Sequence, residues 1–259
     1  MTNVLWFDFA HHFVVTYGMF VDLVQGLKEL VFPDNCFLCR HFLNSRHQEQ
    51  LCPSCKASIA PNAPPFCLGC ARHLEHFSVD GLCASCRAYP PKYDRSWSVC
   101  LYNEPMRNLI HAFKYTNKTG LKKTFDALIQ SFVAMYHVPM EEFEAVAPIP
   151  LHPTRLRERG FNQAQILSEL ISQRYQLSHK PHLLIRQRFT GSQTQLPAKE
   201  RFTNLEGAFK INPSESKIPE SVLIVDDLLT TGATINAAAA ALKDAGTSYV
   251  GAMTLAVTE

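Results

Sequence analysis

The sequence lacks features that would place the protein in several familiar classes. Its 25 lysines and arginines are nearly balanced by 23 aspartates and glutamates, so any nucleic-acid surface must be a local patch. No apolar run is long enough to cross a bilayer, which predicts a protein without a membrane span. Neither the Gly-x-x-x-x-Gly-Lys-Ser/Thr loop nor the Gly-x-Gly-x-x-Gly turn is present. These absences argue against a P-loop motor and a dinucleotide-binding fold.

The first 30 residues lack the marks of a secretory signal. They are apolar and aromatic, but they have no cationic start and no small-residue cleavage site. We therefore expect a cytoplasmic protein. From about Phe13 to Leu30 the apolar residues recur roughly at helical spacing, which predicts an amphipathic segment. We expect its apolar face to pack on the rest of the protein, and docking to a membrane or a partner is the alternative.

The composition changes near Pro90-Pro91. Before this point the chain is rich in Pro, Cys and His, and after it hydrophobic strands alternate with helical stretches. We therefore divide the 259 residues into an N-terminal amphipathic segment (1–31), a cysteine-rich module (32–90) and a C-terminal domain (91–259).

The C-terminal domain has the pattern of an α/β fold. The run Val222–Val225 is continuously aliphatic, as is typical of a strand buried on both faces. The alternation of strands and helices predicts a mainly parallel sheet. The expected strands are 96–102, 146–150, 183–185, 208–211, 222–225 and 249–257. The expected helices are 105–114, 121–137, 162–175 and 233–243.

Eight of the nine cysteines form four Cys-x-x-Cys pairs. Two thiolates on one tight turn can bind a metal ion, and two such turns complete a tetrahedral zinc site. A disulfide scaffold would need a secreted protein, and a thioredoxin-like motif would explain only one pair. We therefore predict two structural Zn²⁺ sites. The ligands are Cys36, Cys39, Cys52, Cys55, Cys67, Cys70, Cys83 and Cys86.

The spacing leaves the grouping of these pairs open. Twelve, eleven and twelve residues separate successive pairs, so two sequential ribbons and an interleaved cross-brace both fit. The remaining cysteine, Cys100, lies in a predicted strand and is expected to be buried.

A ligand pattern follows the run Val222–Val225. Two adjacent acids, Asp226 and Asp227, come next, and we expect them just beyond the strand, at the carboxyl edge of the sheet, where open α/β folds bind ligands. One carboxylate can accept hydrogen bonds from ribose hydroxyls, and its neighbour can complete the pair or hold Mg²⁺.

The turn after these acids suits a phosphate. It leads directly into the helix predicted at 233–243, so it offers backbone N–H groups, Thr hydroxyls and the positive end of a helix. Gly232 lets the backbone approach a ligand closely. We predict a pocket for a phosphorylated ribose. Its residues are Asp226, Asp227, Leu228, Leu229, Thr230, Thr231, Gly232, Ala233 and Thr234.

The whole pattern resembles the type I phosphoribosyltransferases, which bind phosphoribosyl pyrophosphate (PRPP) with Mg²⁺. The segment 146–152, Val-Ala-Pro-Ile-Pro-Leu-His, looks like the family's pyrophosphate loop, whose backbone is often strained. The polar segment 186–204 stands where the family has its mobile catalytic loop. The resemblance implies a further set of PRPP-binding residues: Ile149, Pro150, Leu151, His152, Arg155 and Arg159.

Basic residues gather around these motifs. Residues 150–210 contain ten lysines and arginines and four acids, an excess of +6 in a chain whose net charge is +2. We expect Arg155, Arg159 and Arg188 to contact the ligand, and Lys114 is a further candidate. The catalytic candidates are Asp226, Asp227 and Arg188.

Further motifs connect the cysteine-rich module with this domain. Phe113-Lys114-Tyr115 follows the module, and Arg157-Glu158-Arg159-Gly160-Phe161-Asn162-Gln163-Ala164 follows the predicted pyrophosphate loop. Together with Arg201-x-x-Asn204 before Ala208-Phe209, they resemble the ComF family of bacterial competence and DNA-utilisation proteins. The resemblance runs from about residue 25 to the end of the chain. It implies a double zinc ribbon followed by a type I phosphoribosyltransferase fold.

The resemblance implies a cytoplasmic factor for natural transformation. Such a factor would handle incoming single-stranded DNA beside a DNA translocase or recombination proteins, while PRPP or a related nucleotide modulates it. The aromatic candidates for stacking on bases are Phe37, Phe42, Phe66 and Phe77. The alternative is an active phosphoribosyltransferase, which would transfer ribose 5-phosphate to an amine or a base and release pyrophosphate.

Overall fold

The computed structural model describes residues 35–43, 50–76, 78–115, 119–188, 205 and 207–259. The amphipathic segment predicted at residues 13–30, the stacking candidate Phe77 and most of the loop predicted at 186–204 lie outside the described residues. None of the helices in the described ranges has the length and apolarity needed to span a membrane.

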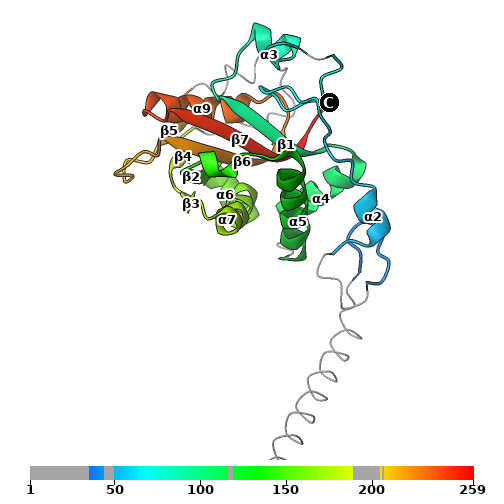
Figure 1. The fold of residues 1–259 in the computed structure, drawn as a ribbon. Coiled ribbons are helices and arrows are strands. Elements are labelled where there is room, and N and C mark those ends of the chain that lie inside the picture. Colours follow the sequence, from blue (N-terminus) through cyan, green and yellow to red (C-terminus); the bar gives the residue numbers. More distant parts are fainter. Residues whose placement is uncertain (1–34, 44–49, 77, 116–118, 189–204, 206) are drawn as a thin grey trace, which may run out of the picture.

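The C-terminal domain is built on a five-stranded sheet in the order β1-β7-β6-β2-β3, with every pair parallel (Figure 1). The predicted parallel sheet is therefore confirmed. The central strand β6 buries Val222–Val225 almost completely, as the aliphatic run predicts. The strands are β1 (Arg95–Leu101), β2 (Ala145–Pro148), β3 (Ser178–His179), β6 (Ser221–Leu229) and β7 (Tyr249–Val257).

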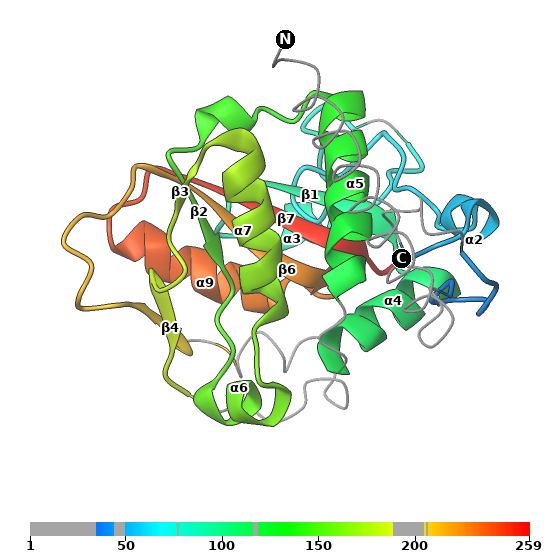
Figure 2. The same ribbon diagram turned by 90° about the horizontal axis from the view of Figure 1, so that it is seen from below.

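Helices cover both faces of this sheet. Figures 1 and 2 show α5 and α7 on one face and α9 on the other. The strand alternation explains the two cores, because Leu223 and Val225 join the core that contains α5 and α7, whereas Val222 and Ile224 join the core that contains α9. The helices are α4 (Glu104–Tyr115), α5 (Thr119–Tyr136), α7 (Gln163–Tyr175) and α9 (Ala233–Asp244).

Two predicted strands form a small separate sheet. β4 (Leu184–Arg186) and β5 (Phe209–Ile211) pair with each other in antiparallel register, outside the main sheet. Their pairing brings the Arg186 guanidinium to 5.5 Å from the centre of the Phe209 ring. The sequence pattern predicts these strands, but it does not reveal their partner.

Three short elements of the C-terminal domain were not predicted, and the two-residue strand β3 is one of them. The helix α6 (Pro153–Arg159) begins with a proline and has no buried residue, so it shows no apolar periodicity. The 3₁₀ turn η1 (Met140–Glu142) spans three residues.

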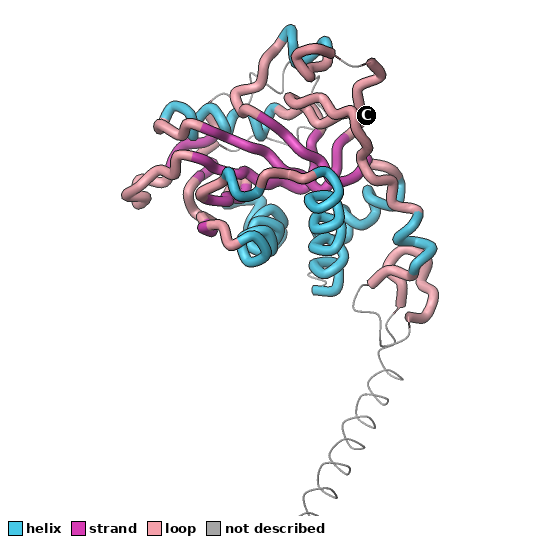
Figure 3. The backbone as a smooth tube through the Cα atoms, viewed as in Figure 1, coloured by secondary structure: helices cyan, strands magenta, loops and turns pink. Residues whose placement is uncertain are grey.

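The cysteine-rich module continues directly into the edge of the sheet. Its polypeptide contains two short helices, α2 (Pro53–Ala57) and α3 (Ala84–Ala88), within a largely irregular trace (Figure 3). The N–H of Ser96 in β1 donates to Leu68 O at 2.8 Å, and Nδ2 of the buried Asn62 donates to Ala71 O and Ser98 O. Cys100 is buried in β1, and burial raises the pKa of its thiol to about 12.

Candidate zinc sites and ligand site

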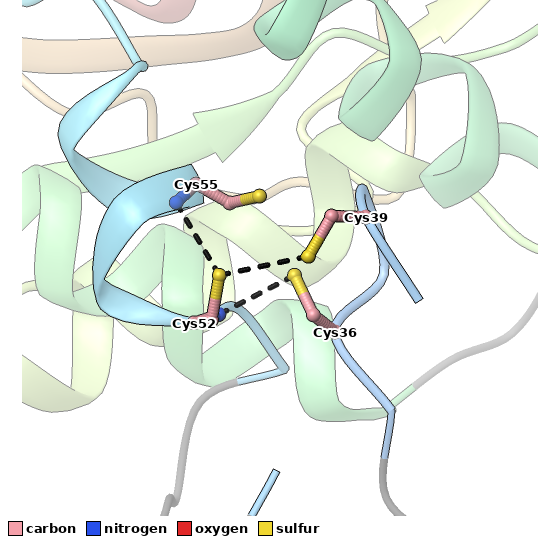
Figure 4. Close-up of side chains that lie close together, drawn as sticks. All are labelled: Cys36, Cys39, Cys52 and Cys55. Carbon is pink, nitrogen blue, oxygen red and sulfur yellow. Dashed lines mark hydrogen bonds between the residues drawn. The ribbon is translucent and has the colours of Figure 1, made fainter. Parts of the chain in front are cut away.

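The first two cysteine pairs form one cluster. The sulfurs of Cys36, Cys39, Cys52 and Cys55 converge, and all lie within 4.8 Å of one another (Figure 4). The sulfurs of Cys39 and Cys52 are 3.7 Å apart. Four thiolates about 2.3 Å from a central zinc ion would be about 3.8 Å apart at the corners of a tetrahedron. The donor set and its spacing therefore fit zinc.

The third and fourth pairs form an equivalent cluster. The sulfurs of Cys67, Cys70, Cys83 and Cys86 also lie within 4.8 Å of one another, and those of Cys70 and Cys83 are 3.7 Å apart. The grouping is therefore sequential, and the interleaved arrangement does not occur. We call the segment 35–59 the first ribbon and the segment 66–88 the second ribbon. In Figure 1 the first ribbon, with α2, lies beside α4, and the second, with α3, lies beside β1.

The two acids of the ligand pattern lie within β6 rather than beyond it. The strand continues to Leu229 because its partner β7 continues to Val257, which corrects the prediction that the acids follow the strand. The neighbouring strand β2, however, ends at Pro148, opposite Val225. Asp226 and Asp227 therefore lie just past the carboxyl end of β2, at the carboxyl edge of the sheet.

Successive side chains of a strand point to opposite faces, so the two acids have different neighbours. Asp227 is buried and forms an ion pair with Lys114 of α4, with 2.8 Å between Nζ and Oδ2. Asp226 is partly exposed and accepts a hydrogen bond from the Asp227 N–H at 2.8 Å. Lys114, only a secondary candidate in the sequence, is thus in direct contact with the acidic pair.

The surroundings of Asp226 raise the pKa of its carboxyl group. Desolvation first, and the charge of Asp227 second, raise its pKa to about 7. The Asp227 N–H, Lys114 and Arg186 act in the opposite direction. Burial and the neighbouring carboxylate therefore favour the protonated form of Asp226, and a bound cation would favour the ionised form.

The turn between β6 and α9 leaves backbone donors available. Gly232 has φ +79° and is the N-cap residue of α9, so the cap position itself offers no side-chain acceptor to the first N–H groups of the helix. The Ala233 N–H makes a long contact of 3.4 Å with Thr231 Oγ1. Leu229 is buried, whereas Thr230, Thr231 and Thr234 are partly exposed. This turn can therefore offer N–H groups and hydroxyls to an anion.

The predicted pyrophosphate loop lies against the same strand. The N–H of Ile149 donates to Val225 O at 2.9 Å, and Asn162 Nδ2 donates to Ile149 O at 3.0 Å. His152 caps α6 by accepting the Thr154 N–H at its Nδ1 atom. Within residues 146–152 the structure has no cis peptide bond and no residue with a left-handed φ.

The three predicted arginines have different surroundings. Arg155 pairs with Glu158 of α6 at 2.9 Å, and Arg159 donates to Oε1 of Gln163, the first residue of α7, at 3.1 Å. Arg188 is exposed at the end of the described segment after β4. The arginine whose charge acts on Asp226 is Arg186, which belongs to the basic excess of residues 150–210 but was not predicted as a ligand contact.

The basic excess of residues 150–210 is partly neutralised. Arg174 pairs with Asp126 at 3.2 Å, and Lys180 pairs with Glu215 at 3.1 Å. Lys199 and Arg201 lie outside the described residues. α6, which carries Arg155, Arg157 and Arg159, directly follows the predicted pyrophosphate loop.

Comparisons with known proteins agree with this architecture. A double zinc ribbon domain matches residues 27–88, and a phosphoribosyl transferase domain matches residues 163–258. Competence protein F of Haemophilus influenzae is 30% identical over 219 residues, which cover 83% of this chain and 94% of that protein. Competence protein ComFC of Bacillus subtilis is 29% identical, over 85% of this chain and 92% of that protein.

A third relative is named for DNA utilisation. The DNA utilization protein YhgH of Escherichia coli K12 is 28% identical over 209 residues, which cover 80% of this chain and 89% of that protein. The two matched domains occur in the order in which the two cysteine clusters and the α/β sheet occur here. The chain belongs to the ComF family of competence and DNA-utilisation proteins, with two four-cysteine zinc-ribbon sites followed by a phosphoribosyl transferase domain.

Proposed function

We propose that the carboxyl edge of the sheet, at Asp226 and Asp227, binds PRPP together with Mg²⁺. The observation that supports this most strongly is the juxtaposition of Asp226 and Asp227 with the uncapped start of α9 at Gly232. Carboxylates suit ribose hydroxyls and Mg²⁺, and the start of a helix suits a phosphate. A phosphorylated ribose carries both groups a short distance apart, so it matches both halves of the site.

The other predicted residues have distinct roles in this proposal. The turn Thr230–Thr234 holds the 5-phosphate through N–H groups and hydroxyls, and the segment 149–152 faces the diphosphate. Arg155 and Arg159 exchange their present partners, Glu158 on α6 and Gln163 on α7, for the diphosphate. Mg²⁺ supplies positive charge beside the diphosphate and the acids, and its binding releases the proton that the raised pKa retains on Asp226. Arg188 is the third catalytic candidate.

We further propose that the protein serves natural transformation by handling incoming single-stranded DNA in the cytoplasm. The names of the relatives, competence protein and DNA utilization protein, support a role of this kind. The first ribbon offers an exposed aromatic and basic surface, because Phe42 is 55% exposed and Arg40 lies over the Phe37 ring at 5.4 Å. Phe66 is less suitable, because its ring packs on Phe132 and Tyr136. A DNA translocase or a recombination protein would be the partner.

Catalysis is the second candidate function. The position of Asp226 beside Asp227 and its raised pKa support it, because a raised pKa makes a carboxylate a better acceptor for a proton from an attacking amine or base. In this alternative the protein transfers ribose 5-phosphate and releases pyrophosphate. Release of pyrophosphate in the presence of one base from a panel would establish it.

Calorimetric titration with Mg²⁺ and PRPP tests the binding site. We expect the wild-type protein to bind, and the double variant Asp226→Asn, Asp227→Asn to lose detectable binding, because both carboxylates that hold the ribose and the metal are gone. Asn keeps the shape of Asp, so the variant also retains the packing around Lys114. The matched control is Asp244→Ala, an exposed acid at the far end of α9. Undiminished binding by the double variant would refute the site.

A further inference from the structure

One side chain of the second ribbon reaches the carboxyl edge of the sheet, where the ligand is proposed to bind. Arg72, two residues after the zinc ligand Cys70, donates from Nε to Thr258 O at 2.7 Å and from Nη2 to Thr230 O at 2.6 Å. Thr230 directly follows β6, and Thr258 directly follows β7. A single guanidinium therefore joins the zinc ribbon to the ends of two central strands.

The hydrogen bond from Arg72 to Thr230 O fixes the orientation of the whole peptide group, not of the carbonyl alone. The peptide between Thr230 and Thr231 is planar and trans, so its C=O and N–H point in opposite directions. When Arg72 holds the Thr230 carbonyl, the Thr231 N–H points away from Arg72. Thr231 and the next residue, Gly232, form the turn that leads into α9. Arg72 therefore sets the orientation of the first donor in the phosphate turn without touching the ligand.

The ribbon in turn holds Arg72 in place. The N–H of Cys67 donates to Arg72 O at 2.8 Å, and the N–H of Ala71 donates to Cys67 O at 2.8 Å. Ala71 is buried, and its carbonyl accepts the hydrogen bond from Asn62. The backbone that carries Arg72 is thus part of the turn that carries two zinc ligands, Cys67 and Cys70.

Tyr93 provides a second contact between this region and the turn. Its hydroxyl lies 3.2 Å from the place where a Cβ on Gly232 would stand. The Tyr93 side chain is buried in the core that also contains Ala71 and Ala233. The phosphate turn is therefore backed by the Arg72 guanidinium of the second ribbon and by the packed ring of Tyr93, which follows that ribbon in the chain.

We propose that Arg72 is a positioning residue for the phosphate turn, so that the second ribbon, and not the first, controls ligand affinity. The inference rests on the proposed binding of PRPP at this turn. The first ribbon supplies an internal comparison, because His41 occupies the position of Arg72: the Cys36 N–H donates to His41 O at 2.7 Å. His41 is exposed. A ribbon can therefore form its zinc turn without a guanidinium at this position.

The test compares Arg72→Met with the matched control His41→Met. We expect Arg72→Met to weaken the binding of Mg²⁺ and PRPP by about tenfold, the order of magnitude of one charge-assisted hydrogen bond, and His41→Met to leave it unchanged. Arg72→Lys should recover part of the affinity, because an ammonium can still donate to one of the two carbonyls. The zinc content should stay at two ions per chain in all three variants.

Hydrogen exchange of the ligand-free variants supplies a readout that general destabilisation does not imitate. We expect faster exchange at residues 231–236 in Arg72→Met, above all at the Asn236 N–H, which donates to Gly232 O at 2.8 Å, with no change in the first ribbon. Unchanged exchange in this turn, or an equal increase throughout the sheet, would overturn the proposal. If the wild-type protein does not bind PRPP, the proposed function fails, whereas the exchange comparison still decides the role of Arg72.

Discussion

The two zinc ribbons are copies of one unit that the protein uses in two ways. Each cysteine of the second ribbon follows its counterpart in the first by 31 residues, from Cys36 and Cys67 to Cys55 and Cys86. Both ribbons repeat the same hydrogen bonds, including a backbone N–H donated to the first sulfur of the site, at 3.3 Å from Cys52 and at 3.2 Å from Cys83. The metal-binding geometry therefore does not distinguish them.

The ribbons differ in the residues that follow the second cysteine of each site. In the first ribbon Arg40, His41 and Phe42 are exposed. In the second ribbon Ala71 is buried and Arg72 bonds to the ends of β6 and β7. The residues after the second cysteine are therefore exposed in the first ribbon, whereas in the second ribbon they join the zinc turn to the ends of two central strands. This difference lies outside the metal site.

Removal of one zinc site at a time gives the largest expected difference between the ribbons. In Cys67→Ser, Cys70→Ser the second ribbon loses two ligands and the order that depends on its metal, so Arg72 loses its support. We expect affinity for Mg²⁺ and PRPP to fall by more than about tenfold, because the hydrogen bonds from the Arg72 guanidinium are lost. Calorimetry measures the affinity, and metal analysis should find one zinc ion per chain.

The equivalent variant of the first ribbon, Cys36→Ser, Cys39→Ser, is the control. It should also retain one zinc ion, but it should bind PRPP like the wild-type protein. Equal losses of affinity in the two variants would show that the ribbons do not differ in this way.

A smaller effect is expected at the exposed surface of the first ribbon. Phe42→Ala should weaken binding of an oligo-dT strand by about 1 kcal/mol, or roughly fivefold, if its ring stacks on one base. The melting temperature should not change, because the ring is already 55% exposed. Fluorescence anisotropy at several salt concentrations measures the affinity, which should fall steeply with salt.

The second ribbon offers a control for this prediction at Val79, a fully exposed apolar residue. Val79→Ala should leave the affinity for the oligonucleotide unchanged. Salt-insensitive binding, or equal effects of the two substitutions, would remove the first ribbon from the DNA-binding surface.

Much of this organisation could be predicted from the sequence because it is local. Each Cys-x-x-Cys pair lies on one turn, and the acids Asp226 and Asp227 directly follow the aliphatic run that identifies the buried part of β6. The grouping of the cysteine pairs could not be predicted, because the three gaps are almost equal and only the folded chain chooses between them.

The missed features depend on distant parts of the chain. The contact of Lys114 with Asp227 requires the packing of α4 against the end of β6, and no local pattern specifies it. Arg72 contacts backbone carbonyls, which every residue possesses, so its partners leave no trace in the sequence. Arg186 was overlooked in favour of Arg188 because the antiparallel pairing of β4 with β5 was not foreseen.

We propose that PRPP binds at the carboxyl edge of the sheet, beside the turn that Arg72 of the second ribbon contacts. Hydrogen exchange of the wild-type protein, with and without Mg²⁺ and PRPP, tests it most directly. We predict that the ligand slows exchange at residues 226–236 and at residues 67–73, and leaves residues 36–43 unchanged. Absence of protection at residues 226–236, or equal protection of the two ribbons, would contradict it.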